Sequence, residues 1–335
     1  MSTANVTPSA EIVFDTLFAY QKSAALKTAI DLELFTAIDD GAHTAAAIAT
    51  RTNVSERGAR ILCDYLTVNR LLAKSDGTYE LVPESSAFLS KRSPAYLGTV
   101  ANFLLRPELR NNFENLTEAV RRGGVGPHDT NIVSNENPVW VEFARSMMPM
   151  MIPAAHAIAG RLASSESIKV LDMAAGHGAF GIAMAQRSPK AQIVALDWKP
   201  VLGLAEENAK AAGVHDRYQT IAGDAITVEY GSDYDVVLVT NFLHHFDVAT
   251  NTNVLKKVHA ALKPGGRVAV LEFVPNPDRV SPPMPAAFSL TMLAETEGGD
   301  AFTFAELRGQ LEDAGFHDVV AHGVPTPQTL LIARK

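Results

Sequence analysis

From Ile168 to the end of the chain, short runs of β-branched and other apolar residues alternate with longer amphipathic segments. The runs are IKVLDM, QIVALD, YQTIAGD, DVVLVTN, RVAVLEF, DVVAHGV and TLLIARK. Near-continuous apolar runs separated by helices are typical of a parallel sheet that helices cover on both faces. Only PTPQ separates the last two runs. Because this connection is too short for a crossover helix, the closing pair of strands is predicted to be antiparallel.

The residues before this alternation have a different pattern. Apolar residues recur at helical spacing from Ile12 to about Ala37, which predicts one or two helices with a wide buried face. Two more helices are predicted in HTAAAIATRT and SERGARILCDYLTVNRLL, followed by a hairpin that turns at Asp76 and Gly77. Helix, helix and hairpin together outline a winged helix.

Charge and cysteine content narrow the classes of function. The formal net charge of -8 argues against nucleic acid or an anionic membrane as the main partner, because phosphate groups attract clustered Lys and Arg. The helix that would read DNA begins with Glu56 and Arg57, a poor set for base contacts. Cys63 is the only cysteine, which excludes an intrachain disulfide. With no visible signal peptide or membrane-length apolar segment, we expect a cytoplasmic protein.

The segment VLDMAAGHGAFG, residues 170 to 181, predicts a strand, a glycine turn and the start of a helix. Gly176 and Gly178 allow a tight turn that brings a ligand close to the helix N-terminus. Together with Gly181 they match the spacing of dinucleotide-binding folds, so a nicotinamide-dependent dehydrogenase is one alternative. The next strand ends at Asp197, where a carboxylate can accept both ribose hydroxyls of either kind of nucleotide.

Four segments taken together, LDMAAGHG, AGDA, LHHF and LKPGGRVAVLE, resemble class I S-adenosylmethionine-dependent methyltransferases. With the N-terminal outline included, nearly the whole chain is similar to the O-methyltransferases of the plant caffeic acid and bacterial polyketide and carotenoid tailoring type. The resemblance implies an α/β fold with a seven-stranded, Rossmann-like sheet whose last strand pair is antiparallel. It also implies a mainly helical, N-terminal winged-helix domain.

The same resemblance implies how the chain is divided. Residues 1–105 would form the winged-helix dimerisation domain, through which two copies of the chain would make a homodimer. Residues 106–335 would form the methyltransferase domain that binds S-adenosylmethionine. Within that domain, residues 106–165 would be a helical connector that lines the substrate pocket.

The cofactor contacts are also implied by the resemblance. The turn that contains Asp172, Gly176 and Gly178 would hold the methionine end, and Asp197 would bind the ribose. Trp198 would lie beside the adenine ring, with Asp224 and Ala225 near the adenine amino group. Ala174 stands where the family usually has its first glycine. Alanine costs little at that position unless the backbone needs a positive φ.

Two adjacent histidines follow the fourth strand, at the sheet edge where ligands of open α/β folds bind. The resemblance implies that His244 is the general base that deprotonates the acceptor hydroxyl and that Glu272 orients it. A second family carboxylate is replaced by Ala301, with Asp300 one position earlier, so either Asp300 substitutes, or His244 relies on Glu272 alone, or the catalytic role is relaxed. Since neighbours in extended chain point to opposite sides, His245 is expected to pack away from this site, and no metal site is expected.

A methionine and phenylalanine stripe marks the predicted acceptor pocket. Phe143, Met147 and Met151 share a helix face, and the resemblance sets the first two, with Met292 and Thr296, against the acceptor. The predicted function is S-adenosylmethionine-dependent O-methylation of a small aromatic or polyketide-like hydroxyl compound. The alternatives are a winged-helix regulator with a nucleotide-sensing domain, and an N-methylating or non-methylating member of the same fold.

Overall fold

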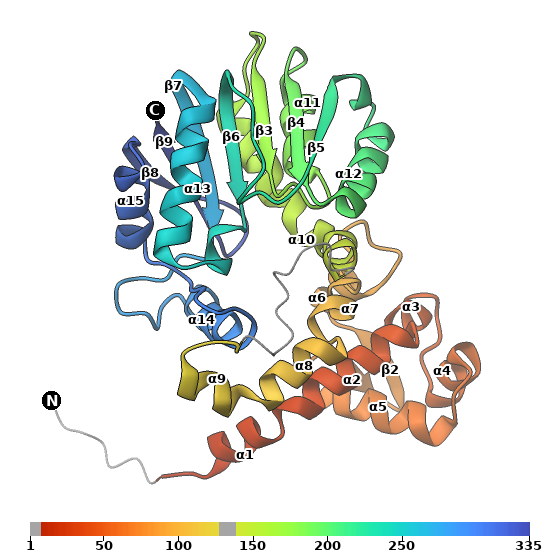
Figure 1. The fold of residues 1–335 in the computed structure, drawn as a ribbon. Helices are drawn as coiled ribbons and strands as arrows, with labels where there is room; N and C mark the ends of the chain where they lie inside the picture. The colour runs from red at the N-terminus through yellow and green to blue at the C-terminus, as the bar shows by residue number, and fades with distance from the viewer. Residues whose placement is uncertain (1–7, 127–138) are drawn as a thin grey trace, which may run out of the picture. The chain divides into compact units, whose positions relative to one another are not determined.

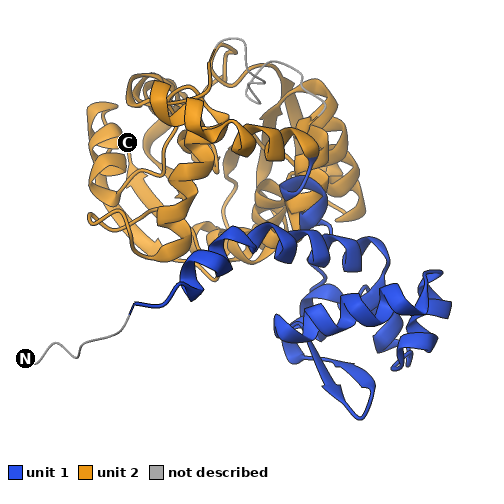
Figure 2. Ribbon diagram, turned by 90° about the horizontal axis from the view of Figure 1, so that it is seen from below, with its two compact units in different colours: residues 1–106 blue, residues 107–335 orange. Residues whose placement is uncertain are grey.

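The computed structural model describes residues 8–126 and 139–335 of the chain. It divides into two compact units, residues 1–106 and 107–335 (Figure 2). The predicted connector, residues 106–165, belongs to the second unit from residue 107 onward, and its part from 127 to 138 lies outside the described residues.

The first unit consists mainly of helices with one small hairpin. Its core surrounds α3 to α5 and the hairpin, with Phe35, Ile48 and Leu66 completely buried. The Ser55 side chain caps α5 by accepting a hydrogen bond from the Gly58 N–H. The predicted hairpin is confirmed, because β1 and β2 pair antiparallel with Ser75 opposite Thr78. The elements are α1 (Glu11–Leu17), α2 (Ala19–Asp31), α3 (Leu34–Asp39), α4 (Ala45–Thr52), α5 (Glu56–Val68), β1 (Leu72–Ser75), β2 (Thr78–Leu81), α6 (Pro83–Leu89) and α7 (Val100–Leu104).

The first helix differs from the sequence-based expectation of a buried apolar face. None of the residues of α1 is buried, and the Ile12 and Leu17 side chains are 75% and 61% exposed. The Phe14 and Phe18 rings stack on each other at a centroid distance of 6.2 Å while remaining about half exposed. The helical spacing was predicted correctly, but among the described residues nothing buries this face.

The second unit contains the predicted sheet, with strand order β5-β4-β3-β6-β7-β9-β8 (Figure 1). Strands β3 to β7 are parallel, while β9 pairs antiparallel with both β7 and β8. The antiparallel closing pair predicted from the short PTPQ connection is therefore confirmed. The strands are β3 (Lys169–Met173), β4 (Gln192–Asp197), β5 (Tyr218–Ala222), β6 (Tyr234–Thr240), β7 (Leu262–Glu272), β8 (His317–Gly323) and β9 (Thr329–Arg334).

Helices cover both faces of this sheet, as the near-continuous apolar strands require (Figure 1). Helices α10, α11 and α12 contact one another, and α13 contacts α15, while α8 and α9 pack against α14. No helix within residues 8–126 and 139–335 is long and apolar enough to cross a membrane. The helices are α8 (Pro107–Glu114), α9 (Leu116–Arg122), α10 (Val139–Leu162), α11 (Ala179–Arg187), α12 (Lys199–Ala211), α13 (Val248–Ala261), α14 (Pro283–Glu295) and α15 (Phe304–Asp313), with short 3-10 turns η1 (His215–Arg217) and η2 (Leu243–His245).

Candidate functional site

A pocket lies beyond the carboxyl ends of β3, β4, β5 and β6, the edge where open α/β sheets bind ligands. Each of these strands is followed by residues that form part of the wall, and α10 adds side chains between its first turn and its middle. Five residues assigned to the cofactor by the sequence lie on this wall: Gly176, Asp197, Trp198, Asp224 and Ala225. Parallel strands bring them together because their carboxyl ends meet at one edge.

The glycine turn after β3 has a left-handed backbone at three alternate positions. Gly176 and Gly178 have φ of +57° and +75°, and Ala174 has φ of +52°. The condition under which alanine is costly at position 174 is therefore met, and the turn carries local strain. Gly178 starts α11 without reaching the pocket, and a Cβ on it would lie 2.6 Å from the Tyr218 hydroxyl. Its role is close packing rather than direct contact with a ligand.

Two carboxyls accept hydrogen bonds from backbone N–H groups of this turn and of α11. Asp172 accepts a hydrogen bond from the Gly181 N–H at 2.8 Å, is fully buried and does not reach the pocket wall. Asp197 accepts from the Gly176 N–H at 2.8 Å and from its neighbour Trp198 at 2.7 Å. Burial raises the pKa of Asp172 to about 7 and the pKa of Asp197 to about 6.

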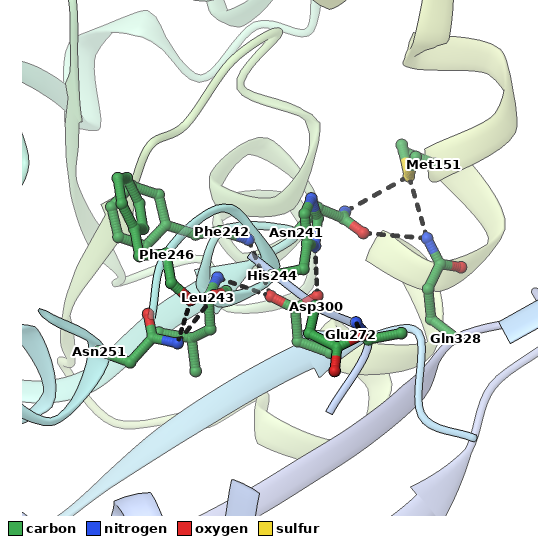
Figure 3. A network of polar contacts seen from close by, with 11 residues as sticks. Met151, Asn241, Phe242, Leu243, His244, Phe246, Asn251, Glu272, Asp300 and Gln328 are labelled. Carbon is green, nitrogen blue, oxygen red and sulfur yellow. Dashed lines mark hydrogen bonds and ion pairs between the residues drawn. The ribbon is translucent and has the colours of Figure 1, made fainter. Parts of the chain in front are cut away.

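The segment after β6 turns sharply over Glu272, the last residue of β7. Glu272 Oε1 accepts hydrogen bonds from the Phe242 N–H at 2.9 Å and the Leu243 N–H at 2.8 Å, and its Oε2 lies 2.5 Å from His244 Nδ1 (Figure 3). Both side chains are buried, His244 with 5% exposure and Glu272 with 2%. A carboxylate on Nδ1 fixes the tautomer of the ring and leaves Nε2 as the acceptor nitrogen.

Asp300 does not take the place of the missing carboxylate. Its Oδ2 lies 3.0 Å from Arg279 Nη1, and its Oδ1 accepts a hydrogen bond from the Ala301 N–H at 2.8 Å. Within the described part of the chain, Glu272 is the carboxylate in contact with His244. Of the possibilities that the sequence left open, the geometry favours Glu272 acting without Asp300.

The expectation that His245 points away from the site is wrong. Residues 243–245 form the 3-10 turn η2 rather than extended chain, so successive side chains are not on opposite sides. The ring centroids of His244 and His245 lie 4.2 Å apart, and it is His245 that lines the pocket. The ring of His244, next to it, is perpendicular to Phe288 of α14 at a centroid distance of 4.9 Å.

The residues predicted for the acceptor separate into two groups. Phe143 and Met151 lie on the pocket wall, whereas Met147 and Met292 are buried away from it. The Thr296 hydroxyl donates to the Met292 carbonyl and accepts from the Gly299 N–H, so it closes the end of α14 instead of reaching the pocket. Composition could not separate these groups, because buried methionines on a helix serve core and pocket alike.

Several wall residues were not identified from the sequence. His177 lies in the glycine turn, and burial lowers its pKa to about 4, so this ring is neutral. Asn241 follows β6 with φ of +52° and accepts a hydrogen bond from Gln328 Nε2 at 3.1 Å. Trp140 stands in the first turn of α10. Of these three residues, only Asn241 has a backbone conformation with a known residue preference, because asparagine tolerates the positive φ that this position adopts.

The described residues contain no group of three or more His, Cys, Asp or Glu side chains arranged to hold a metal ion. His244 and His245 lie close together, but the ring of His244 is held by Glu272.

Comparisons with known proteins agree with this architecture. A model of the O-methyltransferase domain matches residues 129–317, and a model of the O-methyltransferase dimerisation domain matches residues 14–91. The tetracenomycin polyketide synthesis 8-O-methyl transferase TcmO of Streptomyces glaucescens is 29% identical over 95% of this chain and 94% of its own. The 3-hydroxy-5-methyl-1-naphthoate 3-O-methyltransferase of Streptomyces sahachiroi is also 29% identical, over 89% and 87% of the two chains.

A solved structure covers almost the same length. It is a protein of Nostoc punctiforme PCC 73102 that carries the provisional name of an O-methyltransferase. The two chains are 47% identical and superpose with a TM-score of 0.94 over 98% of this chain and 100% of the other.

Proposed function

The chain belongs to the O-methyltransferase family, which uses S-adenosylmethionine, and from that premise we propose that it methylates a hydroxyl group of a small aromatic or polyketide-like compound. The observation that carries this proposal is the His244–Glu272 pair next to the pocket at the strand ends. The test is to follow a labelled methyl group from the donor into a panel of phenols and naphthols. The names of the two Streptomyces relatives guide the choice of this acceptor class.

The proposed site for the methyl donor is the part of the pocket next to the glycine turn. Asp197 makes two hydrogen bonds with backbone N–H groups and has further lone pairs for ribose hydroxyls. Trp198 offers a flat face for the adenine, and Asp224 and Ala225 lie on the same wall. Bound S-adenosylmethionine supplies a methyl group on a sulfonium, with a neutral thioether as the leaving group.

The proposed work of the protein is to align the acceptor and to remove its proton. With Nδ1 directed at Glu272, His244 can take the hydroxyl proton on Nε2 as the oxygen forms its bond to the methyl carbon. Glu272 then stabilises the imidazolium. His245 is the weaker candidate, because burial and the adjacent His244 lower the pKa of His245 well below its usual value.

Lowering the pH is expected to weaken the binding of S-adenosylmethionine. The ionised Asp197 can accept both ribose hydroxyls, whereas the protonated carboxyl cannot. Because the pKa of Asp197 is about 6, the dissociation constant should be nearly constant above pH 7 and should rise below pH 6. The rise should approach ~10-fold per pH unit. Calorimetric titrations between pH 5 and pH 8 measure it.

The Asp197→Asn variant should bind more weakly at pH 8 and lose most of this dependence on pH. The matched control is Asp172→Asn, which removes the neighbouring buried carboxyl with pKa about 7 and leaves the carboxylate on the wall. In the Asp172→Asn variant, the dissociation constant of S-adenosylmethionine should still rise below pH 6. An Asp197→Asn variant with the pH dependence of the natural protein would rule out the ribose assignment.

We also expect the exposed face of α1 to be part of a homodimer interface, in agreement with the matched dimerisation domain. Replacing Phe14 and Leu17 together with serine should raise the dissociation constant of the dimer by ~10²-fold or more, because two large apolar side chains lose their burial. Sedimentation equilibrium measures this change. Val280→Ser, at an exposed apolar position of the second unit, is the control and should leave the dimer intact. Unchanged association of the double variant would place the interface elsewhere.

A further inference from the structure

Two residues of the pocket wall each carry a polar side-chain atom that has no hydrogen-bond partner among the residues that the structure describes. These atoms are Nε1 of Trp140 and Nδ1 of His245, and both atoms are buried. The two rings are nearly perpendicular, with centroids 5.6 Å apart. Because a buried polar atom without a partner is costly, two of them on neighbouring rings of a binding pocket indicate that a ligand atom completes them.

The chemistry of these two atoms defines the group that fits them. The Trp140 N–H can only donate a hydrogen bond. Since the pKa of His245 is lowered by burial and by His244, this ring is neutral at pH 7, with one donor and one acceptor nitrogen. An oxygen atom satisfies both partners: it accepts from the indole, and at Nδ1 a hydroxyl donates, while a carbonyl accepts from the other tautomer.

The charge of the wall favours a neutral oxygen over a carboxylate. The described residues on the wall include no Lys or Arg, while Asp197 and Asp224 are both present. A carboxylate would therefore be buried without a cation, which is far more costly than burying a hydroxyl or carbonyl.

The position of the pair relates this oxygen to the reacting group. His245 follows His244 directly in the 3-10 turn, and their ring centroids lie 4.2 Å apart. With His244 as the proposed base for the reacting hydroxyl, the oxygen that contacts His245 is expected close to that hydroxyl on the bound molecule. The second oxygen thus belongs on the carbon next to the one that carries the reacting hydroxyl, or at the peri position of a fused ring.

Resting on the function proposed above, we propose that Trp140 and His245 form a specificity site for a second, neutral oxygen of the acceptor, adjacent to the hydroxyl that is methylated. The substrate class is then a vicinally or peri-oxygenated aromatic ring rather than a simple phenol. Ring packing alone does not account for the pair, because Trp140 already packs edge-on against Phe143 at 5.7 Å and phenylalanine would serve equally there.

The test compares 2,3-dihydroxynaphthalene with 2-naphthol, which has the same ring system and lacks the second oxygen. The ratio of kcat/KM values should favour the diol by roughly 10-fold or more in the natural protein, beyond the twofold statistical factor. Trp140→Phe and His245→Phe each remove a polar atom and keep a ring. Both variants should bring the ratio down toward the statistical factor, mainly through lower activity on the diol.

Two controls distinguish a specific contact with the second oxygen from a general loss of activity. Phe246→Leu changes a wall ring that has no polar atom and should lower both activities without changing their ratio. The isomer 2,6-dihydroxynaphthalene, with distant oxygens, should exceed 2-naphthol in kcat/KM only by the same twofold statistical factor. Equal kcat/KM for the diol and 2-naphthol in the natural protein, or loss of both activities in parallel in Trp140→Phe and His245→Phe, would overturn the proposal.

Binding measurements distinguish this proposal from the proposed function. Calorimetry with the same compounds, in the presence of S-adenosylhomocysteine, should give tighter binding of 2,3-dihydroxynaphthalene than of 2-naphthol, and the two variants should remove the difference. If this preference is observed without any methyl transfer, the specificity site stands and the proposed function fails. If transfer occurs without any preference in binding or turnover, the specificity site fails alone.

Discussion

Replacing His244 with alanine is expected to lower the turnover of a phenolic acceptor by ~10²-fold or more, as the loss of a general base usually does. Glu272 cannot take the hydroxyl proton in its place, because Glu272 lies on the far side of the imidazole, against Nδ1. Affinity for S-adenosylmethionine should change little, since the glycine turn and Asp197 belong to other strands. Single-turnover rates measure the chemical step directly.

The matched control for this variant is His156→Ala, which removes an exposed imidazole from α10 and should leave turnover unchanged. The loss in His244→Ala should also become smaller as the pH approaches the pKa of the acceptor, because the phenolate then forms without help from the protein. Unchanged turnover at pH 7 would show that His244 is not the base.

Replacing Glu272 with glutamine is expected to cause the second large loss of turnover. The amide oxygen can still accept the hydrogen bonds of the Phe242 and Leu243 N–H groups, so the turn after β6 is kept. The amide nitrogen, however, is a donor and faces His244 Nδ1. It stabilises the tautomer with the proton on Nε2, which cannot accept a proton from the acceptor. In the serine protease triad the same exchange lowers kcat by roughly 10⁴-fold, and we expect ~10²-fold or more here.

The Glu272→Gln variant is informative because it changes the tautomer of His244 while it keeps the backbone hydrogen bonds of the turn after β6. Its melting temperature and its affinity for S-adenosylmethionine should stay close to those of the natural protein, while kcat falls and the KM of the acceptor changes less. Glu272→Ala provides the comparison, since it leaves two backbone N–H groups unpaired in a buried turn and should also destabilise the fold. Full activity of Glu272→Gln would mean that the carboxylate only supports the turn.

The sheet could be predicted from the sequence because its signals are local. A buried parallel strand needs a continuous apolar run, and the PTPQ connection is too short to allow anything but an antiparallel pair between β8 and β9. The strand ends then bring Gly176, Asp197 and Asp224 to one edge, so the wall near the glycine turn could be predicted as well.

The acceptor side of the pocket could not be predicted in the same way. The direction of the His245 ring depends on a 3-10 turn that Glu272 holds through backbone hydrogen bonds from a distant strand. Thr296 is used to close a helix, and no local pattern separates that role from a ligand contact. The apolar spacing of α1 predicted a buried face, whereas none of the residues of α1 is buried, because spacing shows that a helix is amphipathic and not what covers it.

The most direct measurement of the central claim follows a labelled methyl group from S-adenosylmethionine into hydroxylated naphthalenes and locates it in the product by nuclear magnetic resonance. We predict a methyl ether, one equivalent of S-adenosylhomocysteine, and loss of both products in the His244→Ala variant. Label on nitrogen or carbon instead of oxygen, or ether formed at an equal rate without His244, would contradict the account.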